Sequence, residues 1–449
     1  MKADVTPQDT GGGFQLSGPA RDGNLVISGG IGGITFQLQE LAAGAAKLDQ
    51  LSSALGDIER ELHCIWDELC QFQNEPRATG TTALAAVWAA KDSVASVRTQ
   101  LQAISGKVSD CRRDYETAEG FSRTLRSLGI PHLPADYEQH ADFWRTGFLN
   151  RHAMESLVAE SVTAMGPIKS LLEEVLPGYA PKPLEVMQEE SLGIDLEASP
   201  AGLLERIRLI EARGNGYIEV IEVQRDHRTA YVVVIPGTQM EDADSGTNPF
   251  DLGGIADGLG SRSAGVNAAV LKALQAAGAE PGAQVVAAGY SQGGIHAMNF
   301  AADEQVRSRY KVEYVLTAGS PVSRITPPPD VTTLHLEHRT DWVPGSDGSP
   351  NADGGSQVTV TMVNNLYVKT GEDVGLGPGH RLGGYEEGAR LVAASADPSL
   401  VHSTAILGSV LGAGGAAKAT RFSLSRSGRP LPVMTQQGGP VRERGHGGR

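Results

Sequence analysis

The stretch Gly289-Tyr290-Ser291-Gln292-Gly293 has the residue types and spacing of a nucleophilic serine. An apolar run ends at Gly289 and a helical pattern begins after Gly293, which places Ser291 in a sharp turn between a strand and a helix. Glycines on both sides leave room for the neighbouring backbone, and the start of a helix presents its positive end to the serine hydroxyl. The alternative is a serine in an ordinary turn between a strand and a helix.

A serine hydroxyl needs a base, and the base needs a carboxylate that orients it. His380 stands in a glycine-rich loop, after the last predicted strand and before a helix, where such a base belongs. His402 lies on or after that helix and remains the alternative, with a surface histidine as its ordinary interpretation. The other histidines that follow the serine are less suitable, because they fall on the next helix, on the strand expected to carry the acid, or in the tail: His296, His335, His338 and His446.

Asp341 is the predicted orienting carboxylate, because it directly follows the apolar run at 334–338. A carboxylate just beyond the end of a parallel strand lies at the same sheet edge as a turn that carries the nucleophile. Asp347 and Asp353 remain alternatives, and both stand further out in a loop rich in glycine and serine.

Acyl transfer also needs two hydrogen-bond donors for the oxyanion. The backbone N–H of Gln292, immediately after the serine, is one candidate. Thr238 is the other, because it follows the apolar run at 231–235 and a Pro-Gly pair, and its hydroxyl would orient its backbone N–H. A simple turn at this Pro-Gly pair is the alternative.

Strands and helices alternate in the second half of the chain, and these elements must position the candidate residues. Strand-like runs are predicted at residues 217–223, 230–235, 285–288, 312–317, 331–336 and 357–363, with helical patterns at 264–278, 294–304 and 382–395. Nearly continuous apolar strands that alternate with helices favour a mostly parallel sheet covered by helices on both faces. The predicted fold class is therefore α/β.

Residues 200–400 resemble the α/β-hydrolase superfamily, and the segments IPGTQ, GYSQGG, TAGSPV and DWVP, with a later Gly-His and Tyr, are most similar to class 3 lipase-like enzymes. The resemblance implies esterase or lipase chemistry through an acyl-enzyme. Ser291 would be the nucleophile, His380 the base and Asp341 its orienter, and Thr238 with Gln292 would form the oxyanion hole. A fold of this kind hosts many reactions, so a binding protein that uses a hydrolase scaffold is the alternative.

Two apolar stripes in the first half predict a long antiparallel helical hairpin before the hydrolase region. Leucines and isoleucines alternate at spacings of three and four from Leu48 to Leu69, and a second stripe runs from Val87 to Val108. This spacing gives a seam with a period of 3.5 residues, as in coiled coils. The short stretch between the stripes contains Asn74, Pro76 and Gly80, which interrupt the pattern.

Tyr115 and Glu119 form a Tyr-x-x-x-Glu match immediately after the second predicted helix. A helical hairpin followed by this motif resembles the WXG100-like substrates of type VII secretion, although the predicted turn lacks the Trp-x-Gly of that family. The resemblance implies export, with secretion machinery or a helical partner bound through the hairpin. The N-terminal residues show no Sec-type signal peptide. The expected location is cytoplasmic, or outside the cell through a type VII-like route.

The chain has 449 residues and a formal net charge of -15, which argues against a nucleic-acid partner. Serine chemistry requires no cofactor, no Cys/His cluster has zinc spacing, and no apolar run reaches the ~20 residues of a membrane span. A small-molecule or lipid ester is the expected substrate, and a short-chain or polar ester is favoured.

The expected organisation is a flexible glycine-rich arm, the hairpin, a helical and proline-rich connector, the hydrolase domain and a disordered basic tail: 1–34, 35–120, 121–199, 200–402 and 403–449.

Overall fold

The computed structural model describes residues 20–32, 34–73, 77–127, 149–161, 183–225, 228–239, 247–366 and 375–426. They form a mixed α/β structure built on one ten-stranded sheet in the order β1-β2-β9-β8-β7-β6-β5-β4-β10-β3. The strands are β1 Ala20–Asp22, β2 Leu25–Gly29, β3 Leu184–Leu196, β4 Tyr217–Arg225, β5 Arg228–Ile235, β6 Gln284–Tyr290, β7 Lys311–Ala318, β8 Thr332–His338, β9 Gln357–Met362 and β10 Gly415–Arg426.

Five neighbouring strands, β5 to β9, are parallel, and the flanking pairs on both sides are antiparallel. Strands β5 to β8 are almost wholly buried because both faces of the sheet are covered. Their carboxyl ends meet at one edge, so the residues that follow β5, β6 and β8 lie close together. This edge receives Thr238, Ser291 and Asp341.

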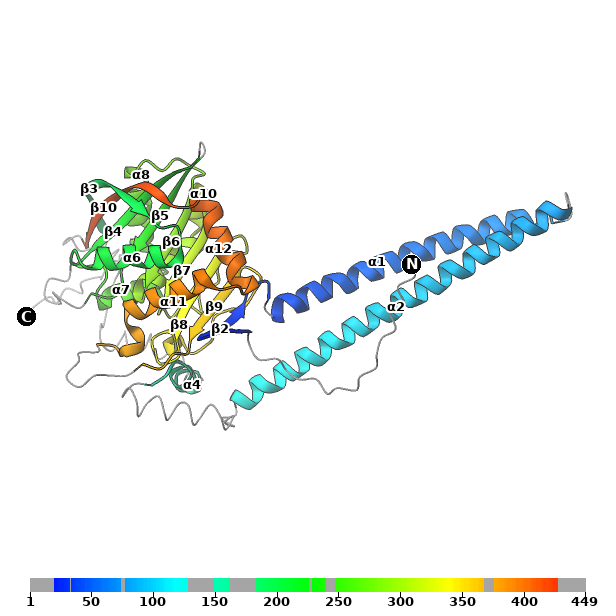
Figure 1. Ribbon diagram of the computed structural model, residues 1–449, viewed down its shortest axis with the longest axis horizontal. Helices are drawn as coiled ribbons and strands as arrows, with labels where there is room; N and C mark the ends of the chain where they lie inside the picture. The colour runs from blue at the N-terminus through cyan, green and yellow to red at the C-terminus, as the bar shows by residue number, and fades with distance from the viewer. Residues whose placement is uncertain are drawn as a thin grey trace, which may run out of the picture.

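Helices cover the sheet in two layers, each with its own apolar core. Helices α6, α11 and α12 pack on one face, and α8, α9 and α10 pack on the other. Figure 1 shows α11 and α12 lying across the strands of the near face. The helices that follow α2 are α4 Arg151–Ser161, α6 Pro200–Glu211, α7 Leu252–Gly260, α8 Ala264–Ala276, α9 Gln292–Ala302, α10 Glu304–Arg309, α11 Leu382–Ala394 and α12 Pro398–Leu411, with 3-10 turns η1 Pro344–Asp347 and η2 Pro378–His380.

Two long helices, α1 Ile34–Cys70 and α2 Arg77–Ser127, run side by side and extend away from the sheet (Figure 1). Leu48, Leu55, Leu62 and Leu69 on α1 are half-buried, as expected for one row of the predicted stripe. Helix α2 continues beyond the expected end of the second helix. Among the described residues, no helix combines the length and apolar character needed to cross a membrane.

The expected boundaries of the arm and the tail are wrong where the structure describes them. Residues 20–29 form β1 and β2, and β2 pairs with β9, so this part of the expected arm belongs to the sheet. Residues 415–426 of the expected tail form β10, which pairs with β4 and with β3 of the expected connector. In β10 the alternate residues Thr420, Phe422, Leu424 and Arg426 are buried, a strand period that its many polar residues conceal in the sequence.

Candidate active site

Ser291 occupies a sharp turn between β6 and α9. Its backbone angles, φ 53° and ψ -122°, lie in a region that residues with a side chain rarely adopt. The flanking glycines explain how the turn packs. A Cβ on Gly289 would lie 2.2 Å from the carbonyl of Gly293, and a Cβ on Gly293 would lie 2.4 Å from the carbonyl oxygen of Pro236. The turn therefore requires the Gly-x-Ser-x-Gly spacing on steric grounds.

The structure brings Ser291, His380 and Asp341 into one hydrogen-bonded chain. The serine Oγ lies 2.9 Å from His380 Nε2, and His380 Nδ1 lies 2.8 Å from Asp341 Oδ2. All three side chains are buried. Because a carboxylate only accepts hydrogen bonds, Nδ1 carries the imidazole proton and Nε2 can accept the proton of the serine hydroxyl.

The carboxylate of Asp341 has two further donors. The backbone N–H of Val343 donates to Oδ1 at 2.9 Å, and the hydroxyl of Tyr385 on α11 donates to Oδ2 at 2.5 Å. Burial raises the pKa of Tyr385 well above 10, so the phenol remains a donor. These contacts fix the carboxylate toward His380.

The alternatives for the base and the acid lie elsewhere. His402 is exposed on α12, and Asp353 is exposed in the loop before β9. Asp347 is buried, but it accepts from the backbone N–H of Ser323 at 2.8 Å and sits near Arg151. Among the described candidates, His380 alone hydrogen-bonds to Ser291, and Asp341 hydrogen-bonds to His380.

The main chain around His380 is held against β6. The hydroxyl of Tyr290, the residue before Ser291, donates to the carbonyl oxygen of His380. The two rings lie 5.2 Å apart between centroids at an interplanar angle of 30°. Gly379 approaches the loop of the acid so closely that a Cβ there would lie 2.6 Å from the backbone nitrogen of Asp341. Both contacts restrict the position of the imidazole relative to its partners.

Thr238 follows β5 and lies beside Ser291, where its residue type fits the predicted oxyanion role. Gln292 is the first residue of α9, a position whose backbone N–H has no acceptor within the helix. The turn before Thr238 is fixed by Glu211 at the end of α6, which accepts from the backbone N–H of Gly237 at 2.9 Å. Burial raises the pKa of the Glu211 carboxyl. Sequence analysis missed Glu211, because nothing local marks a glutamate 26 residues away as its partner.

A cavity of about 230 Å³ opens beside the serine. Its wall includes Leu376 from the loop before η2, and the indole N–H of Trp342 holds that loop by donating to the Leu376 carbonyl at 2.7 Å. The loop and helix at 247–261, which follow β5 in the described part of the chain, contribute no residue to this wall. The described residues that line the cavity are Thr238, Tyr290, Ser291, Gly375, Leu376, Gly377, His380 and Arg381.

Compared with known proteins, the chain matches no family model, no curated protein and no solved structure. The chemistry of this site is therefore inferred from its own geometry.

The secretion motif candidate lies far along the chain from this site. Tyr115 and Glu119 fall inside α2, whereas the sequence placed them after the second helix; their side chains lie outside the described residues. Within the described ranges, no group of three or more His, Cys, Asp or Glu side chains is arranged to hold a metal ion.

Proposed function

We propose that the protein is a serine hydrolase that cleaves carboxylic esters through an acyl-enzyme. The observation that carries the proposal is the chain of hydrogen bonds from Ser291 through His380 to Asp341, with the serine on a strained turn. We also propose that the sheet and its covering helices are an α/β-hydrolase fold. The chain order serine, aspartate, histidine and the position of the serine after a central parallel strand support this assignment.

In the proposed reaction, Ser291 Oγ attacks the ester carbonyl carbon while His380 Nε2 takes its proton. The C–O bond to the alcohol then breaks, and the imidazolium gives its proton to the leaving alkoxide. Water, deprotonated by the same imidazole, then attacks the acyl carbon. The bond between this carbon and Ser291 Oγ breaks, and the imidazolium returns its proton to Oγ as the acid leaves. Asp341 keeps the imidazole oriented and stabilises its positive charge.

The carbonyl oxygen becomes negatively charged in both tetrahedral intermediates. The N–H of Gln292 at the start of α9 is proposed as one donor, and Thr238 as the other. The positive end of α9 favours the same charge. Glu211 supports this arrangement from behind, because its carboxyl group holds the N–H of Gly237 and so sets the position of the next residue.

The size of the cavity favours a small acyl group. Sites for drug-sized ligands usually measure about 300–1,000 Å³, whereas the cavity beside Ser291 measures about 230 Å³. Its wall combines Leu376 and the ring of Tyr290 with several polar groups. A short-chain or polar ester is therefore the proposed substrate class, in preference to a long-chain lipid.

An activity series with p-nitrophenyl esters of increasing chain length tests the function and the substrate class together. We expect the highest kcat/KM on the short esters and loss of activity in Ser291→Ala. Ser320→Ala is a matched control, because Ser320 is also a buried serine near the start of α9, beside Gly294, and its hydroxyl donates only to the Ala318 carbonyl. Ester hydrolysis that survives in Ser291→Ala would rule out this nucleophile.

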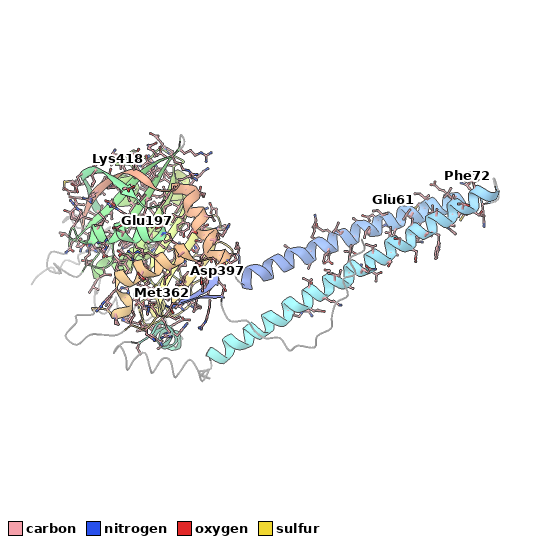
Figure 2. All side chains as sticks on the ribbon, in the orientation of Figure 1. Glu61, Phe72, Glu197, Met362, Asp397 and Lys418 are labelled. Atoms are coloured by element: carbon pink, nitrogen blue, oxygen red, sulfur yellow. The ribbon has the colours of Figure 1, made fainter. Side chains whose placement is uncertain are left out.

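We propose a second role for α1 and α2, the binding of a helical partner, and a specific surface supports it. Leu51, Ile58, Ile65 and Phe72 follow each other at seven-residue intervals and are 44% to 55% exposed. Figure 2 shows Phe72 near the end of α1 that lies farthest from the sheet. A heptad row that α2 leaves exposed is typical of a helix with a further helical partner.

Export by a type VII-like route is the form of partner binding that we propose from the Tyr115 and Glu119 motif. The test follows the protein in the culture medium of its source organism for the wild type, Tyr115→Ala and the double variant Ile58→Glu, Ile65→Glu. We expect export of the wild type and loss of export in both variants. Absence of the wild type from the medium, or unchanged export of Tyr115→Ala, would contradict the proposal.

A further inference from the structure

A line of buried polar side chains runs along α9 from Gln292, the residue that follows the candidate nucleophile. His296 stands one helical turn after Gln292, and both side chains are buried. Ser263 and Asn299 complete the line from α8 and from the next turn of α9. The proposed chemical steps use none of these four side chains, yet burying polar groups requires compensation by hydrogen bonds.

The direction of each hydrogen bond in this line follows from its donors. The amide nitrogen of Asn299 donates to Ser263 Oγ at 2.9 Å, which leaves the Ser263 hydroxyl proton available for His296 Nδ1, 2.7 Å away. On its other side the ring faces the amide oxygen of Gln292, which only accepts, so the proton of the neutral ring resides on Nε2 and Nδ1 is the acceptor. Burial lowers the pKa of His296 to about 3, which keeps the ring neutral at ordinary pH.

The surroundings of Gln292 determine how its side-chain amide is oriented. The oxygen accepts from the backbone N–H of Ile255 at 3.0 Å and from His296 Nε2 at 3.2 Å. The nitrogen then faces three acceptors: the carbonyl oxygen of Phe250 at 3.0 Å, Thr238 Oγ1 at 3.2 Å and the carbonyl oxygen of Asp251 at 3.3 Å. The two nearer acceptors, Phe250 and Thr238, take its two protons. The opposite orientation would place two donors against the amide nitrogen and would leave the carbonyl of Phe250 without this donor.

We propose that His296 is a positioning residue of the oxyanion hole. It donates to the side-chain oxygen of Gln292 and so directs the amide nitrogen of Gln292 toward the Thr238 hydroxyl. The proton of that hydroxyl can then bind the oxygen of the substrate. This inference rests on the proposed hydrolase function. Because the amide nitrogen of Gln292 donates to Thr238 Oγ1, the hydroxyl proton of Thr238 is not used in that hydrogen bond. It can point toward the cavity beside Ser291. Gln292 then serves the oxyanion twice, with its backbone N–H and through Thr238.

The backbone around the line is shaped to preserve it. Arg262 and Ser263 both have positive φ, at 51° and 57°, a costly conformation for residues with side chains. It places Ser263 Oγ beside the imidazole. Gly254 provides the room for the Gln292 amide, because a Cβ at this position would lie 2.0 Å from the end of that side chain. The strained residues thus lie at the Ser263 end of the line of buried polar side chains, and the close approach lies at its Gln292 end.

The test compares His296→Leu, which removes the donor to Gln292, with His296→Gln, which keeps an N–H near the position of Nε2. The readouts are kcat and KM on p-nitrophenyl acetate and inhibition by a trifluoromethyl ketone, whose adduct with serine carries an oxyanion. We expect His296→Leu to lower kcat about tenfold or more, within the ~10²–10³ limit for loss of a whole donor, and to weaken the inhibitor similarly. We expect KM to change less than about threefold and His296→Gln to recover most of kcat.

Thr238→Val supplies the decisive background, since it removes the hydroxyl through which His296 is proposed to act. In that background His296→Leu is expected to change kcat by less than about threefold, because residues that act as a unit are not additive. His335→Leu is the control for general destabilisation. His335 is another buried histidine, with Nδ1 2.7 Å from Thr317 Oγ1, and its replacement is expected to lower stability without changing kcat.

Two results would overturn the role of His296: wild-type kcat in a folded His296→Leu variant, or an equal loss of kcat in the Thr238→Val background. If His296→Leu does not fold, Ser263→Ala replaces it, because it removes the donor that fixes the imidazole proton on Nε2. The same outcomes then apply to Ser263→Ala. A wild type without esterase activity would instead remove the proposed hydrolase function, so the two failures are distinguishable.

Discussion

Asp347 allows a quantitative test of how the loop after the candidate acid is packed. Its side chain is 4% exposed, and its Oδ1 has no hydrogen-bond partner among the described residues. Burial raises the pKa of this carboxyl from 3.8 to about 6, and the contacts with Ser323 and the charge of Arg151 oppose the rise only in part. Replacement by asparagine keeps the shape and an acceptor for the Ser323 N–H, but removes the charge.

Whether stability rises or falls with pH depends on which state, folded or unfolded, binds the proton of Asp347 more tightly. Between pH 3.8 and about 6 the folded protein keeps a proton on Asp347 that the unfolded chain has lost, so stability falls as pH rises through this range. Over the whole titration, a pKa rise of this size changes the free energy of unfolding by about 3 kcal/mol. Between pH 4.5 and pH 7 we expect the free energy of unfolding of the wild type to fall by about 2 kcal/mol relative to that of Asp347→Asn.

The assay is urea unfolding of the full chain at pH 4.5, 5.5, 6.25 and 7, followed by tryptophan fluorescence and circular dichroism. Comparing the variant with the wild type at each pH cancels contributions that do not depend on Asp347. Asp353→Asn is the matched control, since this residue is exposed in the same region of the chain. It shows the effect of removing an exposed carboxylate from this part of the chain, against which the effect of the buried one is measured.

If the difference in free energy of unfolding between Asp347→Asn and the wild type does not change with pH, burial does not raise the pKa of Asp347. The same conclusion follows from a difference that changes in the opposite direction, because Asp347 would then be stabilised as an anion. In that case the contact with Arg151 would outweigh burial, and the carboxylate would belong to an ion-pair network with the buried Glu337.

Three further substitutions have definite expected outcomes. Arg151→Met should lower the free energy of unfolding in urea by about 3–5 kcal/mol, because it leaves the buried carboxylate of Glu337 without its partner at 2.6 Å. Gly293→Ala should lower stability by about 1–3 kcal/mol in thermal unfolding and reduce esterase activity, because its Cβ would displace the Pro236 backbone next to the proposed oxyanion donor. Tyr385→Phe should lower stability by about 1.5–3 kcal/mol and reduce kcat, because the triad carboxylate loses a charged hydrogen bond. Unchanged unfolding in any of the three would contradict the corresponding contact.

The residues of the candidate site were predictable because their signals are local. The serine turn has a fixed spacing of glycines between a strand and a helix, and the acid and base follow the ends of later elements. The carboxyl ends of parallel strands meet at one edge, so residues such as Ser291 and Asp341 come together without knowledge of the full fold. Their roles in catalysis remain predictions.

The parts that sequence analysis missed depend on pairing between distant segments. Strand β10 pairs with β3 more than 200 residues earlier in the chain, and its charged residues conceal the alternation of buried positions. Strand β2 is short and pairs with β9, and the glycines around it made this segment resemble an arm. Glu211 and His296 act through contacts with other elements, which the sequence around them does not reveal.

The end of α2 was also misplaced. The sequence predicts that the second helix ends before Tyr115 and the hairpin at Gly120, whereas the structure continues the helix to Ser127. A glycine inside a helix costs only about 1 kcal/mol relative to alanine, so it does not terminate a long helix by itself.

Reaction with a fluorophosphonate probe tests whether Ser291 is an activated nucleophile. Intact-mass analysis and peptide mapping of the labelled protein would locate the adduct. We expect a single adduct on Ser291 in the wild type, no adduct in Ser291→Ala, and strongly slowed labelling in His380→Ala. No labelling of the folded wild type, or labelling that persists in Ser291→Ala, would contradict this role of Ser291.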